Sequence, residues 1–173
     1  MSAVQNNIVI VNEAEARWTM APVAVALGGV STIQAGTPTK AVDAAGANPY
    51  LGTVVPMVDG DGTTSQRFTG LCKATSTDTA AAAGVTTLWL PLPGLVYASK
   101  SKDLTAVNTA AKLTTFFGKR VVFDLTASLW SIDTAAADAV ANQVVIIGGD
   151  FNTSTVYFVY ANSGTILNFR ISA

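Results

Sequence analysis

Turn-forming residues interrupt this chain so often that most of its segments are long enough only for short β-strands. Four turns fall between residues 28 and 62: Gly28-Gly29, Gly36-Thr37-Pro38, Gly46-Ala47-Asn48-Pro49 and Asp59-Gly60-Asp61-Gly62. Glycine, proline, asparagine and aspartate adopt the backbone angles that turns require, so clusters of them end regular elements. Many short segments between closely spaced turns are typical of an all-β sandwich or barrel.

The segments between the turns are rich in β-branched and aromatic residues, which predicts strands. The expected strands cover residues 8–11, 18–27, 39–42, 50–55, 66–74, 85–90, 94–99, 120–125, 129–132, 143–147, 155–160 and 166–171. Pro22 should bend or bulge the second of them, because proline lacks the N–H that a ladder needs. Strict alternation places Phe68 and Cys72 on one face of their strand. Residues 120–132 predict one hairpin, and residues 143–160 predict another that turns at 148–150.

Residues 103–117 are the best helix candidate in the chain. Asp103 is a favoured N-cap residue, and Leu104, Val107 and Ala111 recur at helical spacing. The helix should be marginal, because threonine and Asn108 have low helix propensity.

These elements predict a mainly β fold with a single domain. We expect an antiparallel β-sandwich or barrel over residues 18–173, with one short helix. Residues 1–17 are polar and hold both glutamates of the protein, Glu13 and Glu15. They are expected to form an extended N-terminal arm that contains the short strand at 8–11 and that a partner orders.

The composition excludes several classes of function. Only 12% of the 173 residues are charged, against about 25% in an average soluble protein, and the net charge is −1. A nucleic-acid-binding protein would carry a basic excess or stripe, so no nucleic-acid partner is expected. The chain has no histidine, which excludes Ser-His-Asp and Cys-His catalysis and histidine-ligated zinc.

Membrane and export signals are also not predicted. Residues 18–39 carry no charge, but prolines and glycines interrupt them, so they do not form the run of about 20 apolar residues that spans a bilayer. The first residues lack the basic and apolar regions of a signal peptide. No membrane partner is expected.

No constellation of catalytic, cofactor-binding or metal-ligating residues is predicted. Residues 59–62 resemble the opening of a calcium loop, but Gly70 stands where an EF-hand places its glutamate, which favours a surface turn. The single cysteine, Cys72, cannot form an intramolecular disulfide, and its apolar surroundings favour a small buried side chain. An enzyme is therefore not expected, and neither are cofactors or metals.

Two polar sets deserve separate interpretation. Residues 99–102 alternate serine and lysine, so Lys100 and Lys102 should share one strand face, opposite Ser99 and Ser101. We expect this segment to be exposed and to make polar contacts with a partner, since a catalytic Ser–Lys pair needs a desolvated lysine. Convergence of Asp124 and Asp133 stays open, although solvated surface positions are the preferred interpretation.

The order of segments resembles that of decoration (cement) proteins of tailed-bacteriophage capsids. The resemblance spans roughly residues 18–161 and rests on five blocks: Gly36-Thr-Pro-Thr-Lys-Ala-Val, Tyr50-Leu-Gly-Thr-Val, Phe68-Thr-Gly-Leu-Cys-Lys-Ala, Gly84-Val-Thr-Thr-Leu-Trp-Leu-Pro-Leu-Pro-Gly-Leu-Val-Tyr, and Val121-Val-Phe-Asp-Leu-Thr-Ala-Ser-Leu-Trp-Ser-Ile-Asp followed by Val144-Val-Ile-Ile-Gly. Phe116-Phe117 and the tail after Asn162 depart from the pattern, which leaves their roles open.

The resemblance implies a structural virion protein. Such proteins are small, β-rich and usually trimeric, and they sit on the outside of the expanded capsid at threefold or pseudo-threefold positions. There they bridge major capsid subunits and stabilise the shell against the pressure of packaged DNA. The implied partners are the major capsid protein and two further copies, as a homotrimer. The implied location is the virion exterior, after synthesis in the bacterial host cytoplasm.

Two alternatives to this function stay open. The chain is also compatible with another virion component, such as a head fibre or a tail module. As a carbohydrate-binding β-module it would use Trp18, Trp89 and Trp130 as sugar-stacking platforms, although each lies in an apolar run that favours the core. We expect the N-terminal arm to touch the capsid, so that deletion of residues 2–16 abolishes capsid binding and leaves the fold intact.

Overall fold

The computed structural model describes residues 8–11, 19–25, 32–41, 53–63, 68–77, 84–91, 94–127 and 129–161. The strands are β1 (Val9–Ile10), β2 (Thr19–Val25), β3 (Thr32–Ile33), β4 (Pro38–Ala41), β5 (Thr53–Pro56), β6 (Phe68–Cys72), β7 (Ser76–Thr77), β8 (Gly84–Trp89), β9 (Tyr97–Lys100), β10 (Arg120–Thr126), β11 (Leu129–Asp133), β12 (Val144–Asp150) and β13 (Thr155–Tyr160). In the described part of the chain, a 3-10 turn (Leu104–Ala106) and the helix α1 (Ala110–Thr114) accompany these strands. The predicted mainly β class is confirmed.

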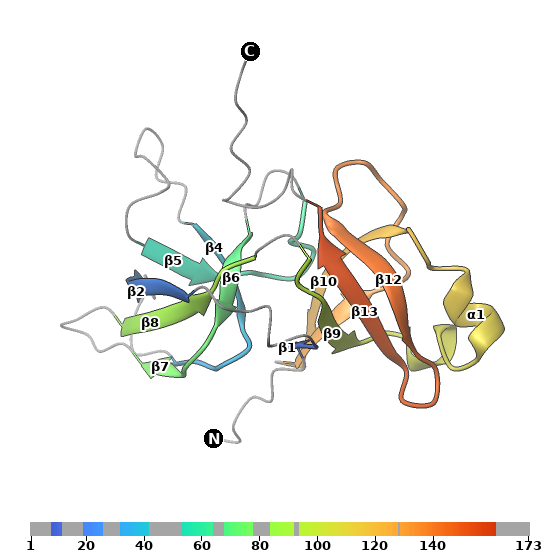
Figure 1. The fold of residues 1–173 in the computed structure, drawn as a ribbon, viewed down its shortest axis with the longest axis horizontal. Helices are drawn as coiled ribbons and strands as arrows, with labels where there is room; N and C mark the ends of the chain where they lie inside the picture. Colours follow the sequence, from blue (N-terminus) through green and yellow to red (C-terminus); the bar gives the residue numbers. More distant parts are fainter. Residues whose placement is uncertain are drawn as a thin grey trace, which may run out of the picture.

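The strands form two halves that lie side by side (Figure 1). One half is a closed barrel with the order β2-β5-β4-β6-β8, and the other is a six-stranded sheet with the order β1-β9-β13-β12-β10-β11. All pairs are antiparallel except β2 with β5. A closed ring of five strands cannot alternate in direction throughout, because five is an odd number, so one pair must be parallel. Strands β3 and β7 form a separate small ladder.

Aromatic side chains fill the boundary between the halves. Phe68 on β6 stacks on Tyr160 of β13, with ring centroids 4.0 Å apart, and meets Tyr97 edge-on at 6.1 Å. Phe123 and Phe158 extend this cluster into the sheet, with ring centroids 6.1 Å apart. Every residue of β6 is buried, since one face of the strand packs in the barrel and the other packs against the sheet.

The strict alternation predicted for β6 is wrong. Phe68 and Leu71 belong to the large core shared with the sheet, whereas Cys72 packs in the small barrel core with Ile33 and Leu88. The ladder with β4 shifts register next to Gly70, because Thr39 pairs with Gly70 and the next residue of β4 pairs with Phe68. One extra residue in a strand reverses which side chains face each side beyond it.

The predicted short helix is present within residues 103–117, but it is shorter than expected, because the segment divides into the 3-10 turn and α1. The Asp103 carboxylate accepts a hydrogen bond from the Thr105 N–H at 2.8 Å and caps the 3-10 turn. The Thr109 hydroxyl accepts one from the Lys112 N–H at 3.3 Å and caps α1. Two capping side chains six residues apart therefore divide the segment into two short elements.

Both predicted C-terminal hairpins form, but the second turns at a different place. Strands β10 and β11 pair directly, as do β12 and β13. The predicted turn at 148–150 is wrong, because Gly148 and Gly149 continue β12 and the turn falls at residues 151–154. A Cβ on Gly149 would collide with the carbonyl oxygen of Thr155 and press on Leu113 at 3.1 Å. The glycines thus serve close packing within the strand.

Strand β1 fastens part of the N-terminal region to the sheet. It pairs with β9, and Ile8 and Ile10 are only 2% and 9% exposed in the large core. The predicted strand at 8–11 is therefore present, and so is the predicted bulge in β2, between Met20 and Val23. Deletion of residues 2–16 would remove core side chains, so it is not the neutral change expected from the sequence. The predicted strand at 166–171 and residues 1–7 and 12–18 lie outside the described residues.

We predict that Gly70→Ala destabilises the protein far more than Gly60→Ala. Both glycines have positive φ, +151° and +79°, so each substitution costs backbone strain. A Cβ on Gly70 would also collide with the Trp89 carbonyl oxygen of β8, whereas one on Gly60 meets nothing within 4 Å. Urea unfolding should give a loss of about 3 kcal/mol or more for Gly70→Ala and about 1–2 kcal/mol for Gly60→Ala. Equal losses would contradict the collision.

Candidate functional site

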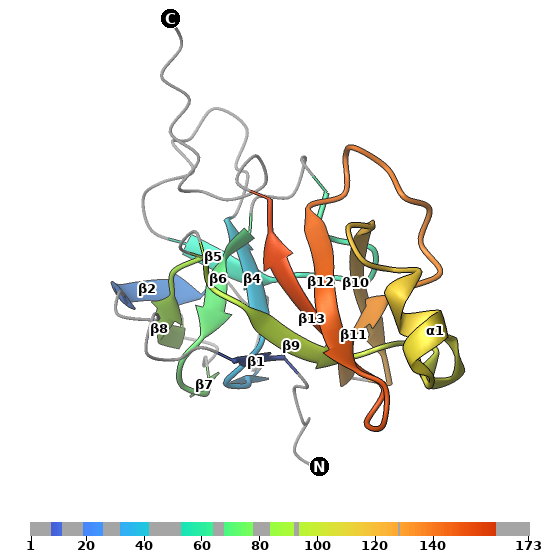
Figure 2. The same ribbon diagram turned by 45° about the vertical axis from the view of Figure 1, so that its right-hand side comes forward.

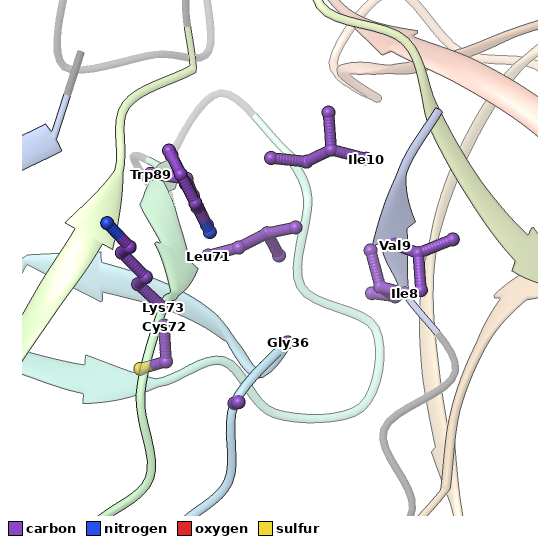
Figure 3. A pocket seen from close by; sticks show the side chains of 9 residues that line it. Ile8, Val9, Ile10, Gly36, Leu71, Cys72, Lys73 and Trp89 are labelled. Carbon is purple, nitrogen blue, oxygen red and sulfur yellow. The ribbon is translucent and has the colours of Figure 1, made fainter. Parts of the chain in front are cut away.

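A groove of about 240 Å³ opens where β1 faces the barrel. Strand β1 forms one wall, and the turn before β4 together with β6 and β8 forms the other (Figure 3). Ile10 reaches from β1 toward Leu71 and Trp89 on the opposite wall (Figure 3). The groove therefore combines segments from both halves and from widely separated parts of the sequence.

Backbone hydrogen bonds hold the barrel wall of the groove. The Gly36 N–H donates to the Cys72 carbonyl oxygen at 2.8 Å, and the Cys72 N–H donates to that of Thr37 at 3.0 Å. The Lys73 N–H donates to the Thr87 carbonyl oxygen at 2.8 Å. Gly36 has a φ of +82°, which glycine adopts without strain and which allows the sharp turn into β4. These bonds form the wall in advance of any ligand.

The rim of the groove is basic. Lys73 is exposed, and its Nζ lies 4.5 Å from the ring centroid of Trp89 (Figure 3). A cation over an indole face is attracted by the ring quadrupole, which orients the lysine along the rim. Lys73 is the one charged side chain among the lining residues, and within the described parts of the chain no carboxylate pairs with it. Apolar side chains therefore share the groove with backbone polar groups, and the Lys73 ammonium lies on the side of Trp89 that is turned away from β1 (Figure 3).

Cys72 lies at the base of the barrel wall and is 1% exposed. Burial raises the pKa of its thiol from 9.0 to about 11, and a hydrogen bond with Thr86 offsets part of this effect. The sulfur is therefore a neutral thiol at physiological pH, without the thiolate character that nucleophilic cysteines need. The interpretation of Cys72 as a small buried side chain is confirmed.

A second polar cluster lies around Lys102, just after β9. The Lys102 Nζ lies 2.6 Å from Asp124 Oδ1 and 3.4 Å from Asp133 Oδ2. Asp124 is 1% exposed and also accepts hydrogen bonds from the Thr126 and Ser131 hydroxyls, at 2.8 and 3.0 Å. Asp124 and Asp133, whose convergence the sequence could not decide, do converge on Lys102. The prediction that they are solvated surface residues is wrong for Asp124.

Charge pairing in this cluster keeps its groups ionised. Burial alone would raise the pKa of Asp124, but hydrogen bonds from Lys102, Thr126 and Ser131 outweigh it and leave that pKa lowered. The hydrogen bond to Asp124 raises the pKa of Lys102. A carboxylate and an ammonium that both stay charged near neutral pH serve as a static link between the end of β9 and the β10–β11 hairpin, not as a general acid and base.

The prediction that residues 99–102 are exposed is wrong for the two serines. Ser99 and Ser101 are buried, and the Ser101 hydroxyl contacts that of Thr134 at 2.9 Å. The reason is that β9 lies inside the sheet order, between β1 and β13. Lys100 points to the other face and donates to the Thr153 carbonyl oxygen. No Ser–Lys pair forms.

The Asp59–Gly62 turn joins the two halves. The Asp61 carboxylate is buried and accepts from the Lys40 Nζ and the Val58 N–H, both at 2.7 Å. The Asp59 carboxylate accepts from the Leu125 N–H at 3.3 Å. The turn is therefore more buried than the predicted surface turn, and in the part of the chain that the structure describes no group of three or more potential ligands could hold a metal ion.

The tryptophans occupy different environments. Trp130 is buried and meets Phe123 edge-on, with ring centroids 6.0 Å apart, which confirms its core assignment. Trp89 is only partly buried, and one side of it faces the groove. Trp18 lies outside the described residues. The contact between Lys73 and Trp89 was not predicted from the sequence. The one signal for it in the sequence is the position of a lysine directly after a buried strand.

Comparisons with known proteins assign no family. No protein-family model, curated protein or solved structure matches this chain. Among the described elements, no helix combines the length and the hydropathy that a membrane span requires.

We predict that Cys72 resists thiol reagents in the folded protein. At pH 8 a shift of the pKa from 9.0 to about 11 lowers the thiolate fraction about hundredfold. Labelling with an aromatic disulfide should therefore be at least that much slower in buffer than in 8 M urea at the same pH. Comparable rates would show that the barrel wall of the groove opens readily.

We predict that Asp124 contributes stability that disappears in acid. Its pKa in the folded protein lies below the unfolded value, so the contribution is complete above the unfolded pKa of about 3.9 and is lost as the pH falls through the folded pKa. Urea unfolding between pH 6 and pH 2 should show a smaller acid loss for Asp124→Asn than for wild type. Asp138→Asn removes an exposed carboxylate and serves as the charge-matched control. If the unfolding free energy of Asp124→Asn fell as much between pH 6 and pH 2 as that of the wild-type protein, this role of Asp124 would be contradicted.

Proposed function

We propose that this protein is a virion structural protein that binds the outer surface of a phage capsid. In this proposal it acts as a homotrimer at threefold or pseudo-threefold positions and stabilises the expanded shell against the internal pressure of DNA. The observation that carries the proposal is the preformed groove between the halves, which apolar side chains line together with backbone polar groups and Lys73, and which suits a protein partner better than a reaction. The segment order that resembles capsid decoration proteins gives it independent support.

A trimeric decoration protein must contact two kinds of partner, and two apolar surfaces support this requirement. The first surrounds β1, where Val9 is 56% exposed beside the groove. The second lies at the far end of the six-stranded sheet, around α1 and the β12–β13 turn (Figure 2). Its exposed side chains are Leu104, Phe117 and Phe151, and the Ser154 hydroxyl donates to the Leu104 carbonyl oxygen at 2.9 Å. We assign the groove surface to the capsid and the α1 surface to contacts between copies.

Stabilisation of the shell follows from mass action. A protein that binds assembled capsid and not free subunits shifts the equilibrium toward the assembled shell. Each large apolar side chain covered by the partner contributes about 1.5–3 kcal/mol. Three linked copies bind with an avidity that exceeds the affinity of one copy, so modest contacts per copy suffice. Neither a substrate nor a cofactor is needed for this role.

We predict stoichiometric binding to expanded capsids from which native decoration has been stripped. Co-sedimentation titrated to saturation should give three copies per threefold or pseudo-threefold position. Unexpanded capsids serve as the control and should bind less, since the positions change during expansion. Absence of binding by folded protein would contradict the proposal.

A carbohydrate-binding module is the second candidate, because the partly exposed Trp89 lies in an open groove. Titration of tryptophan fluorescence with glycans separates the two functions. We expect no saturable change for the wild-type protein. A saturable change that Trp89→Phe abolishes, together with no capsid binding, would favour the carbohydrate function.

A further inference from the structure

Strand β1 presents a free backbone edge toward its surroundings. Among the described strands it is the last in the sheet order, and β9 is its one partner there. The Val11 N–H donates to the Val96 carbonyl oxygen at 2.8 Å, and Val9 pairs with Ala98. Because hydrogen-bonded and non-hydrogen-bonded pairs alternate in an antiparallel ladder, the N–H and C=O of Ile10 point away from β9. No residue in the described ranges bonds to them, and such an edge accepts a further strand.

The size of the adjoining groove limits what fills it. Its volume of about 240 Å³ is below the roughly 300–1,000 Å³ of typical small-molecule sites. Ile10, Leu71 and Trp89 line it, so the space suits one or two aliphatic side chains of a peptide.

The charge of Lys73 adds a second requirement on the segment that binds at the groove. Lys73 is exposed beside the groove, and among the residues that the structure describes no acidic side chain lines it. Its Nζ stays near the Trp89 ring, so the charge keeps a defined place relative to the apolar space. A carboxylate on the bound segment would pair with Lys73, and a basic segment would be repelled.

We propose that the groove takes an extended, acidic-aliphatic segment of the capsid subunit, which pairs with the free edge of β1. Its aliphatic side chain lies between Ile10, Leu71 and Trp89, and its carboxylate pairs with Lys73. Strand addition of this kind gives affinity through main-chain hydrogen bonds and specificity through side-chain pockets. The inference rests on the proposed capsid function and names the partner segment by its chemistry.

Two substitutions on exposed positions test the groove without removing core side chains. Lys73→Glu reverses the rim charge, and Ala35→Trp places a bulky ring at the groove mouth. Each should weaken binding to stripped, expanded capsids by about tenfold or more in co-sedimentation. The unfolding midpoint of each variant in urea, compared with that of the wild-type protein, establishes that it is folded.

Matched controls use one exposed position that belongs to neither apolar surface. Ala135 is exposed in the connection between β11 and β12. Ala135→Glu adds a negative charge there, and Ala135→Trp adds the same ring that Ala35→Trp places at the groove. Both controls should bind capsids within about twofold of wild type.

Hydrogen exchange tests the strand pairing itself. In the free protein the Ile10 amide should exchange faster than the Val11 amide, which is bonded to Val96. On capsids the Ile10 amide should gain protection of at least about tenfold, and the Val11 amide should change little. Amide-resolved exchange after dissociation from the particles measures both in one experiment.

The outcomes separate this inference from the proposed function. If wild-type protein binds capsids but both groove variants bind equally well and Ile10 gains no protection, the inference is wrong and the function stands. Protection of Ile10 that rises with protein concentration without capsids would assign the edge to a second copy and overturn the inference. Absence of wild-type binding would remove the proposed function and this inference together.

Discussion

The stacking of Phe68 on Tyr160 is the contact on which the rest of the structure depends. It joins β6 of the barrel to β13 of the sheet across the boundary of the two halves, with rings 4.0 Å apart and nearly parallel. Burial raises the pKa of Tyr160 well above its ordinary value, so the phenol stays neutral within the cluster. Backbone hydrogen bonds also join the halves at this boundary. The Gly60 N–H donates to the Phe123 carbonyl oxygen at 3.0 Å, and the Phe123 N–H donates to the Asp61 carbonyl oxygen at 2.8 Å. The halves therefore hold one relative position.

That fixed position creates the groove. Its walls come from β1 of the sheet and from β6 and β8 of the barrel, so its width depends on how the halves meet. A site that is formed before binding costs little conformational entropy when a partner segment enters. The apolar walls then supply contact area, and Lys73 supplies a preference for acidic segments. The proposed decoration function thus uses a groove to which both halves contribute apolar side chains.

The parts of the fold that the sequence predicted are local. The β10–β11 and β12–β13 hairpins, β8 and the bulge at Pro22 follow from residues that are neighbours in the chain. The β6 register shift at Gly70 was missed because it lies in the ladder with β4, which is distant in the sequence, and no local pattern reveals it. The division of the helical segment was missed because Thr109 caps a second element in addition to the one that Asp103 caps. The groove was missed because its walls come from four separate segments.

Electron cryomicroscopy of saturated capsids would show whether the groove beside β1 faces the shell. We expect a map in which β1 lies against the capsid, with density for an additional strand along its free edge and a side chain between Leu71 and Trp89. The α1 end should then meet neighbouring copies around the threefold position. A map in which the groove is open to solvent, with the capsid contacted through α1 or the β12–β13 turn, would contradict the account.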